Sequence, residues 1–170
     1  YKTVYFGRQN PSHIRYLIDH SGYVEGWATY AESYAYDYAA DYLSSGQTAS
    51  REDAAFAHLC WLNRSVNLCI YSLMDTGIHY RGWTPAQSAR FLKLFGIRDA
   101  SVTAEIYRYI TETPANYLKY YAGYLNFLDL KEEQQELLGE NFDLKAFHQQ
   151  LLTIGPVQFP VLRKYISEKL

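Results

Sequence analysis

The chain has 170 residues, of which 48% are hydrophobic and 20% are charged, and its formal net charge is −2. These values fit one globular domain that buries a substantial core, and they exclude a disordered chain. The lack of a basic excess argues against nucleic acid as a main partner, and no apolar stretch of the sequence reaches the length of a membrane-spanning helix.

The predicted elements are all helices. Apolar residues at helical spacing, polar caps and terminal Gly or Pro residues predict helices at 13–20, 23–43, 50 to about 79, 85–96, 101–111, 114–138, 142–152 and 160–169. No stretch shows the sustained alternation of a β-strand. The sequence therefore predicts an all-α fold of roughly seven or eight helices, with residues 1-170 as a single helical domain.

Short local signals set several of these boundaries. They are a Ser-Gly break at 21–22, a serine cap at 50, a Thr-Pro start at 84–85 and a second Thr-Pro start at 113–114. A threonine cap followed by proline at the first helical position is a typical helix beginning. The second Thr-Pro pair is therefore expected to begin the helix that runs toward residue 138.

Tyrosine is unusually frequent, with eighteen Tyr against eight Phe. One interpretation is a helical core whose rim is amphipathic, with hydroxyls reaching water or backbone. The other is a cleft lined with hydroxyl donors. Composition by itself favours the first interpretation, in which the tyrosines lie at the amphipathic rim of the core.

Two carboxylates form the first candidate site. A helix turns about 100° per residue, so Glu25 and Glu32 share one face with Thr29. Both could face solvent, or Glu25 could lie in the first helical turn, where the helix dipole favours an acid. The functional alternative is that Glu25 is a zinc ligand, because a carboxylate held on a helix is a common zinc donor.

Asp75 and His79 form the second candidate site. Their spacing of four residues places both side chains on one helix face. A carboxylate beside a histidine can fix the orientation and tautomer of the ring, as in metal sites and catalytic pairs. The alternative is a salt bridge at a helix end.

Arg108 and Tyr120 are the third pair of candidates. Arg108 could bind a substrate carboxylate, or it could pair with an acid such as Glu32 or Glu105. Tyr120 could donate its hydroxyl to a developing oxyanion, or it could be one more amphipathic aromatic.

Five segments in chain order carry a family resemblance. They are Glu25-Gly26-Trp27-Ala28 with Tyr30-Ala31-Glu32, Asp75-Thr76-Gly77-Ile78-His79 with Gly82-Trp83, Glu105-Ile106 with Arg108-Tyr109-Ile110, Pro114 through Tyr120 with Gly123, and Phe142 through His148 with Gly155-Pro156. Together they resemble the bacterial domain-of-unknown-function family DUF885, whose helical fold is similar to that of the thermostable-type zinc carboxypeptidases. The chain departs from the family where Pro-Gly-Gln is replaced by Pro114-Ala115-Asn116 and Ser-Tyr-Lys by Lys119-Tyr120-Tyr121.

The resemblance implies a site that is only partly contained in this chain. The family pattern has an H-E-x-x-P-G-H element that would end just before Tyr1 and would supply the zinc-binding histidines and the general base. Glu25 would be the remaining zinc ligand, and His79 and Tyr120 would be catalytic groups facing the substrate carbonyl. Substrate-binding or supporting roles are implied for four further residues, which are Arg108, Glu32, Asp75 and Tyr109.

The expected function follows from that assignment. The chain would be the C-terminal part of a zinc-dependent metallopeptidase that acts on peptides, and by itself it would be inactive and would not retain zinc. The alternative is a non-catalytic helical module that keeps the fold and binds a partner without metal. Because envelope lipoproteins occur in the family, the resemblance also implies an extracytoplasmic or cell-envelope location.

Overall fold

A computed structural model describes residues 2–9, 11–45 and 51–167. Within these ranges the chain forms nine α-helices, one 3-10 turn and no β-strand, which confirms the predicted all-α class. The helices are α1 (Lys2–Gly7), α2 (Ile14–Leu17), α3 (Ser21–Ser45), α4 (Arg51–His79), α5 (Pro85–Lys93), α6 (Ala100–Glu112), α7 (Leu118–Leu138), α8 (Leu144–Ile154) and α9 (Phe159–Ser167), and the 3-10 turn η1 covers Gly139–Asn141.

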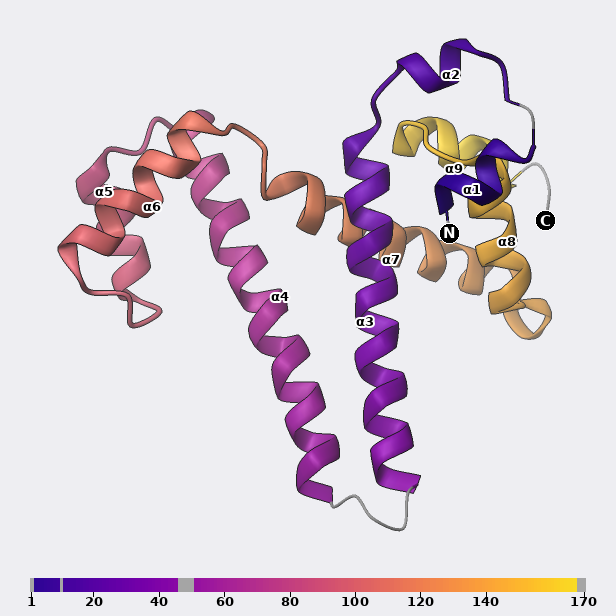
Figure 1. The fold of residues 1–170 in the computed structure, drawn as a ribbon, viewed down its shortest axis with the longest axis horizontal. Coiled ribbons are helices and arrows are strands. Elements are labelled where there is room, and N and C mark those ends of the chain that lie inside the picture. Colours follow the sequence, from indigo (N-terminus) through magenta and orange to yellow (C-terminus); the bar gives the residue numbers. More distant parts are fainter. Residues whose placement is uncertain (1, 10, 46–50, 168–170) are drawn as a thin grey trace.

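Three long helices organise the molecule. Figure 1 shows α3 and α4 as an antiparallel pair that splays apart, with α7 crossing α3 and extending to both sides. Helices α5 and α6 pack at the C-terminal end of α4, whereas α1, α8 and α9 gather around the far half of α7 (Figure 1). None of the helices in the described ranges is long and apolar enough to cross a membrane.

The core is divided into two clusters. The first cluster joins α3, α7, α8 and α9 around Tyr23, Tyr30, Phe127 and Leu151, and Trp27 and Trp61 pack against it. The second cluster joins α4, α5 and α6 around Ile70, Met74, Leu92 and Ile110, and Trp83 packs against it. Fully burying an apolar side chain of this size stabilises the fold by roughly 1.5–3 kcal/mol, so each cluster can hold its helices together.

The helices α3 and α7 approach most closely at two glycines. A Cβ atom added to Gly26 would lie 2.5 Å from the carbonyl carbon of Gly123, and one added to Gly123 would meet the backbone of Gly22 and Gly26. Only residues without side chains permit backbones to pack at this separation. The crossing therefore fixes where α7 lies along α3. Glu25 directly precedes Gly26, so it lies beside this crossing.

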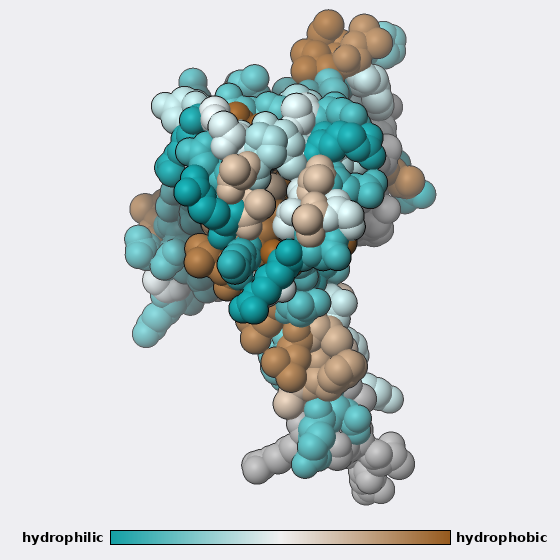
Figure 2. All heavy atoms as spheres, turned by 90° about the vertical axis from the view of Figure 1, so that its left-hand side faces the viewer, coloured by the Kyte–Doolittle hydropathy of each residue, from teal (hydrophilic) through white to brown (hydrophobic). Residues whose placement is uncertain are grey.

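The C-terminal half of α3 and the N-terminal half of α4 extend beyond both clusters (Figure 1). On α4 the exposed apolar side chains there include Phe56, Leu59, Leu62 and Val66. Figure 2 shows hydrophobic side chains on this narrow part of the molecule, below α5 and α6.

The predicted boundaries are partly correct. Thr84 caps α5 as expected: its hydroxyl accepts from the Gln87 backbone N–H at 3.3 Å, and the Gln87 side chain accepts from the Thr84 N–H at 2.9 Å. The predicted break at 21–22 is wrong, because α3 begins at Ser21 and runs through Gly22. The predicted cap at residue 50 lies outside the described residues.

The expected helix beginning at residue 114 is also wrong. Thr113 ends α6, and α7 begins at Leu118. Between them Ala115 has a φ of 60°, the left-handed region that favours glycine. This conformation is incompatible with a continuous right-handed helix, so the segment forms a turn that directs α7 across α3.

Candidate functional site

Asp75 is a buried carboxylate near the end of α4. Its side chain is only 3% exposed, and its Oδ1 atom lies 4.0 Å from His79 Nε2. The backbone N–H of Ala115 donates to the same carboxylate, whereas Oδ2 has no partner within the described part of the chain. Burial raises the pKa of Asp75, and the nearby His79 and the Ala115 N–H partly oppose that rise. The prediction that Asp75 and His79 share a helix face is confirmed.

A backbone carbonyl fixes the ring of His79. The His79 Nε2 atom lies 3.0 Å from the carbonyl oxygen of Ile110 on α6. Because a carbonyl only accepts, we assign the proton to Nε2, which leaves Nδ1 as the second ring nitrogen. Neutral His79 therefore offers Nδ1 as an acceptor, and protonated His79 offers it as a donor.

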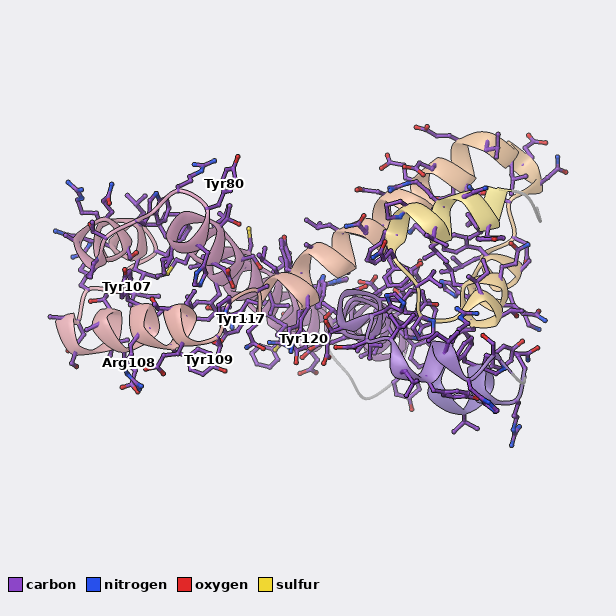
Figure 3. All side chains as sticks on the ribbon, turned by 90° about the horizontal axis from the view of Figure 1, so that it is seen from above. Tyr80, Tyr107, Arg108, Tyr109, Tyr117 and Tyr120 are labelled. Carbon is purple, nitrogen blue, oxygen red and sulfur yellow. The ribbon has the colours of Figure 1, made fainter. Side chains whose placement is uncertain are left out.

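Two neighbouring pockets lie beside this pair and share Tyr117. We call the first the apolar pocket; it has a volume of about 210 Å³ and is lined by Tyr71, Glu105, Ile106, Tyr109, Ile110 and Tyr117. We call the second the arginine pocket; it has a volume of about 220 Å³ and is lined by Arg64, Leu68, Asn116, Tyr117 and Tyr120. Figure 3 shows Tyr109, Tyr117 and Tyr120 following one another from α6 onto α7, with Tyr80 pointing away on the opposite side.

The tyrosines of the two pockets form a connected set. The rings of Tyr71 and Tyr117 have centroids 4.7 Å apart, and those of Tyr109 and Tyr117 are 6.2 Å apart. Within the described ranges the hydroxyls of Tyr71, Tyr117 and Tyr120 have no hydrogen-bond partner, whereas the Tyr109 hydroxyl accepts from Asn116 at 3.4 Å. Other tyrosines, such as Tyr23, are buried in the core. Tyrosines whose hydroxyls bond to backbone, such as Tyr23, and tyrosines that line pockets therefore both occur among the described residues.

The arginine beside Tyr120 is Arg64. Its Nε donates to Glu32 Oε1 at 3.4 Å, which joins α4 to α3. The predicted pairing of Glu32 with Arg108 is wrong, because Arg108 binds Glu105 and Glu112 of its own helix at 3.2 and 3.0 Å. Arg108 is largely exposed and lines neither pocket.

Glu25 lies in the second turn of α3, beside the crossing with α7. The first turn of α3 holds no acidic residue, so the helix-dipole interpretation of Glu25 is wrong. The Glu25 side chain is half-buried, and within the described ranges its carboxylate has no hydrogen bond or ion pair. Tyr120 lies one turn before Gly123 on α7, so the glycine crossing brings the Glu25 turn and the Tyr120 turn toward each other.

Five of the seven predicted site residues thus fall into three positions. Asp75 and His79 adjoin the apolar pocket through Ile110. Tyr109 lines the apolar pocket and Tyr120 lines the arginine pocket, and Glu25 lies at the crossing. Among the described residues, no three His, Cys, Asp or Glu side chains come together in a group that could hold a metal ion. The described chain therefore offers single metal donors and no complete metal site.

Comparison with known proteins identifies the family. The family described as "Bacterial protein of unknown function (DUF885)" matches residues 5–166. The chain belongs to this family. The resemblance that rested on five short segments is thereby confirmed for DUF885, whereas similarity to zinc carboxypeptidases stays a prediction.

A solved structure supports the fold of this DUF885 chain. It is that of a candidate lipoprotein of unknown function from Shewanella oneidensis, with a TM-score of 0.71 and 26% sequence identity. The match covers 98% of this chain and 28% of that protein, so the chain spans less than a third of its length. No curated protein matches the chain.

The sequence did not indicate the pocket residues Arg64 and Tyr71. Their spacing of seven residues places them on one face of a helix, which is the available signal. Nothing local to them predicts that Asn116 and Tyr117 of the DUF885 chain pack against that face, because this contact depends on the turn at Ala115.

A half-buried polar cluster around His148 was also missed. His148 Nε2 lies 2.9 Å from the Tyr30 hydroxyl, which donates to the Tyr34 hydroxyl at 3.2 Å, and Lys131 Nζ donates to Tyr34 at 3.3 Å. Trp27 contacts the imidazole edge to face, with ring centroids 5.6 Å apart. Burial lowers the pKa of His148, and the charge of Lys131 lowers it further. The cluster joins α3, α7 and α8 within the first core cluster.

Proposed function

We propose that this DUF885 chain forms the C-terminal part of a zinc-dependent peptidase, in which Glu25 is one zinc ligand. The observation that supports the proposal is the Glu25 carboxylate, which is half-buried at the α3–α7 crossing and has no protein partner in the described ranges. A carboxylate removed from water needs a compensating cation, and zinc is a common partner for a helix-borne carboxylate.

The chain fits such a site only in part. Glu25 supplies one donor, and the other ligands and the general base would come from segments of a longer protein beyond these 170 residues. Bound zinc would supply activation of a water molecule for attack on a peptide carbonyl.

His79 and Tyr120 would bind the carbonyl oxygen of the scissile peptide. The Ile110 carbonyl holds His79 Nε2–H, so protonated His79 presents Nδ1–H as the free donor. Tyr120 presents a hydroxyl without a partner in the described ranges. Donors fixed before the reaction stabilise the charge that develops on that oxygen, and losing one such donor typically lowers kcat by about 10²–10³-fold. Asp75 would lie beside His79, with its Oδ1 atom 4.0 Å from Nε2.

The location of the longer protein is part of the same proposal. The description of the Shewanella oneidensis neighbour as a candidate lipoprotein favours an extracytoplasmic or cell-envelope location. A peptidase attached there would meet peptides outside the cytoplasm.

Zinc content tests the assignment of Glu25. In the full-length protein, we expect wild type and Glu32→Gln to retain zinc and Glu25→Gln to lose most of it, as measured by elemental analysis after dialysis. Glu32→Gln is the matched comparison because it removes a carboxylate two turns along the same face of α3. Equal zinc in Glu25→Gln and wild type would remove Glu25 from the site.

Hydrolysis of a peptide library is the second arm of this test. We expect the full-length protein to hydrolyse peptides only with zinc present, and the isolated 170-residue chain to show no hydrolysis. A full-length protein with neither zinc nor hydrolysis would favour the non-catalytic helical module instead. Zinc-dependent hydrolysis by the isolated chain would overturn the division of the site between this chain and other segments.

A further inference from the structure

The arginine pocket is rich in hydrogen-bond donors. Arg64 binds Glu32 through Nε, and within the described ranges the two terminal nitrogens of its guanidinium have no protein partner. Tyr117, Tyr120 and Asn116, whose side chains carry two hydroxyls and an amide, line the same pocket. No carboxylate lines this pocket. A planar guanidinium fork with neighbouring hydroxyl donors matches the geometry of a carboxylate.

The apolar pocket, which shares Tyr117 with the arginine pocket, is lined mainly by apolar and aromatic side chains. Ile106, Ile110 and the rings of Tyr71 and Tyr109 form most of its wall. Its volume of about 210 Å³ exceeds the roughly 150 Å³ that suffices to hold a benzene ring in a protein cavity. Glu105 also lines it, but that carboxylate is engaged by Arg108 at 3.2 Å. The pocket therefore suits one aromatic or branched apolar side chain.

Tyr117 lies between the apolar pocket and the arginine pocket and lines both. Its ring packs on Tyr71 and Tyr109, which line the apolar pocket with it, and it lines the arginine pocket together with Arg64 and Tyr120. One ligand residue could therefore place its side chain on one side of Tyr117 and its carboxylate on the other. The two groups of an amino acid that satisfy this arrangement are the side chain and the α-carboxylate.

We infer that the two pockets form one binding site for an aromatic or bulky apolar amino acid residue with a free α-carboxylate. The ligand is the C-terminal residue of a peptide or the free amino acid. Arg64 pairs with the carboxylate, the Tyr117 hydroxyl donates to it, and the side chain occupies the apolar pocket.

This site deepens the proposed function without depending on hydrolysis. As a statement about substrate it rests on that function, because Tyr120 lines the arginine pocket and would also face the scissile carbonyl. As a binding site it needs neither zinc nor the longer protein. A binding measurement on the zinc-free 170-residue chain therefore separates failure of this inference from failure of the proposed function.

The test compares three small ligands by calorimetric or NMR titration of the chain. They are N-acetyl-L-phenylalanine, its C-terminal amide and free L-phenylalanine. We expect the N-acetylated acid to bind at least about tenfold more tightly than the amide, because only the acid forms charge-assisted bonds with Arg64. Tighter binding of the N-acetylated acid than of free L-phenylalanine identifies a peptide C-terminus as the ligand, and the reverse order identifies the free amino acid.

Variants locate the binding site. Arg64→Gln is expected to abolish the preference for acid over amide, and Tyr117→Phe, which keeps the ring, to reduce it severalfold. Arg163→Gln is the matched control, because Arg163 binds Glu133 at 2.8 Å in a comparable ion pair away from both pockets. Equal affinity for acid and amide, no binding of either, or an unchanged preference in both Arg64→Gln and Tyr117→Phe would overturn the inference.

Discussion

Ala115 shows how one residue can set the position of a helix. Its φ of 60° is costly for any residue with a Cβ atom, by about 1–2 kcal/mol. The turn at Ala115 nevertheless brings its N–H to the buried Asp75 carboxylate and directs Tyr117 and Tyr120 to the pockets. The same backbone conformation thus supports both parts of the candidate site.

Replacing Ala115 with glycine should stabilise the protein. Glycine removes the strain of about 1–2 kcal/mol, and its greater freedom in the unfolded chain offsets about 0.4–1 kcal/mol of that gain. We expect Ala115→Gly to raise the free energy of unfolding by about 0.5–1 kcal/mol in urea denaturation. The control is Ala104→Gly in the exposed interior of α6, which should lower it by about 1 kcal/mol. Destabilisation by both changes would contradict the left-handed conformation at Ala115.

At the scale of elements, the crossing of α3 and α7 depends on two glycines. A methyl group at Gly26 would lie 2.5 Å from the backbone carbonyl carbon of Gly123. The backbone cannot move aside as a flexible side chain can. The helices would have to separate, and Glu25 and Tyr120 would separate with them. The crossing is thus the contact through which packing and the proposed site are linked.

Substitutions on one helix can test this contact. We expect Gly26→Ala to lower the free energy of unfolding by about 1–3 kcal/mol or more through overpacking. Gly22→Ala, one turn earlier on α3, has nothing within 4 Å of the added methyl and should be neutral or slightly stabilising because alanine favours helix. Chemical denaturation of both variants checks the prediction, and equal effects at the two positions would mean that the crossing is looser than described.

Helix propensity and capping predicted most elements because these signals are local. Thr84 with Pro85 predicted the start of α5 correctly, since a side-chain cap acts within one turn. The same Thr-Pro signal failed at 113–114 because the left-handed Ala115 interrupts the chain before α7. The predicted break at 21–22 is wrong because packing of the Gly22 and Gly26 backbone against α7 overrides the low helix propensity of glycine.

At the scale of the whole molecule, the candidate site could be predicted only where its residues share a helix. The proximity of Asp75 and His79 could be predicted from their spacing of four residues on one helix. The pockets combine residues of α4 with residues around the start of α7, so Arg64 and Tyr71 have no local signal that points to Asn116 and Tyr117. Pairing of Glu32 with Arg64 instead of Arg108 follows from the antiparallel arrangement of α3 and α4, which periodicity does not give.

The His148 cluster should make the stability of the whole fold sensitive to mild acid. The pKa of half-buried His148 lies below its ordinary value of 6.5, so as the pH falls the unfolded chain takes up the proton first. The contribution of neutral His148 to stability is therefore complete above pH 6.5 and declines as the pH falls through that value toward the lowered folded-state pKa.

Urea denaturation between pH 7.5 and pH 5 can measure this decline. We expect His148→Phe, which keeps a ring among Trp27 and Tyr30 but cannot titrate, to show a shallower loss of stability than wild type. The control is His58→Gln, because His58 is exposed beside Asp37 and contributes no buried ring. Identical pH profiles for wild type and His148→Phe would show that His148 is not the titrating group.

The division of the core into two clusters has a spectroscopic consequence. The chain has three tryptophans, and Trp27 and Trp61 pack on the first cluster whereas Trp83 packs on the second. Fluorescence emission from Trp83 therefore reports on the second cluster, and emission from Trp27 on α3 and Trp61 on α4 reports on the first cluster. Replacing Trp83 alone, or the other two together, yields two versions of the protein in which each half is seen without the other. Coincident unfolding curves from the two versions would establish that the halves melt as one cooperative unit.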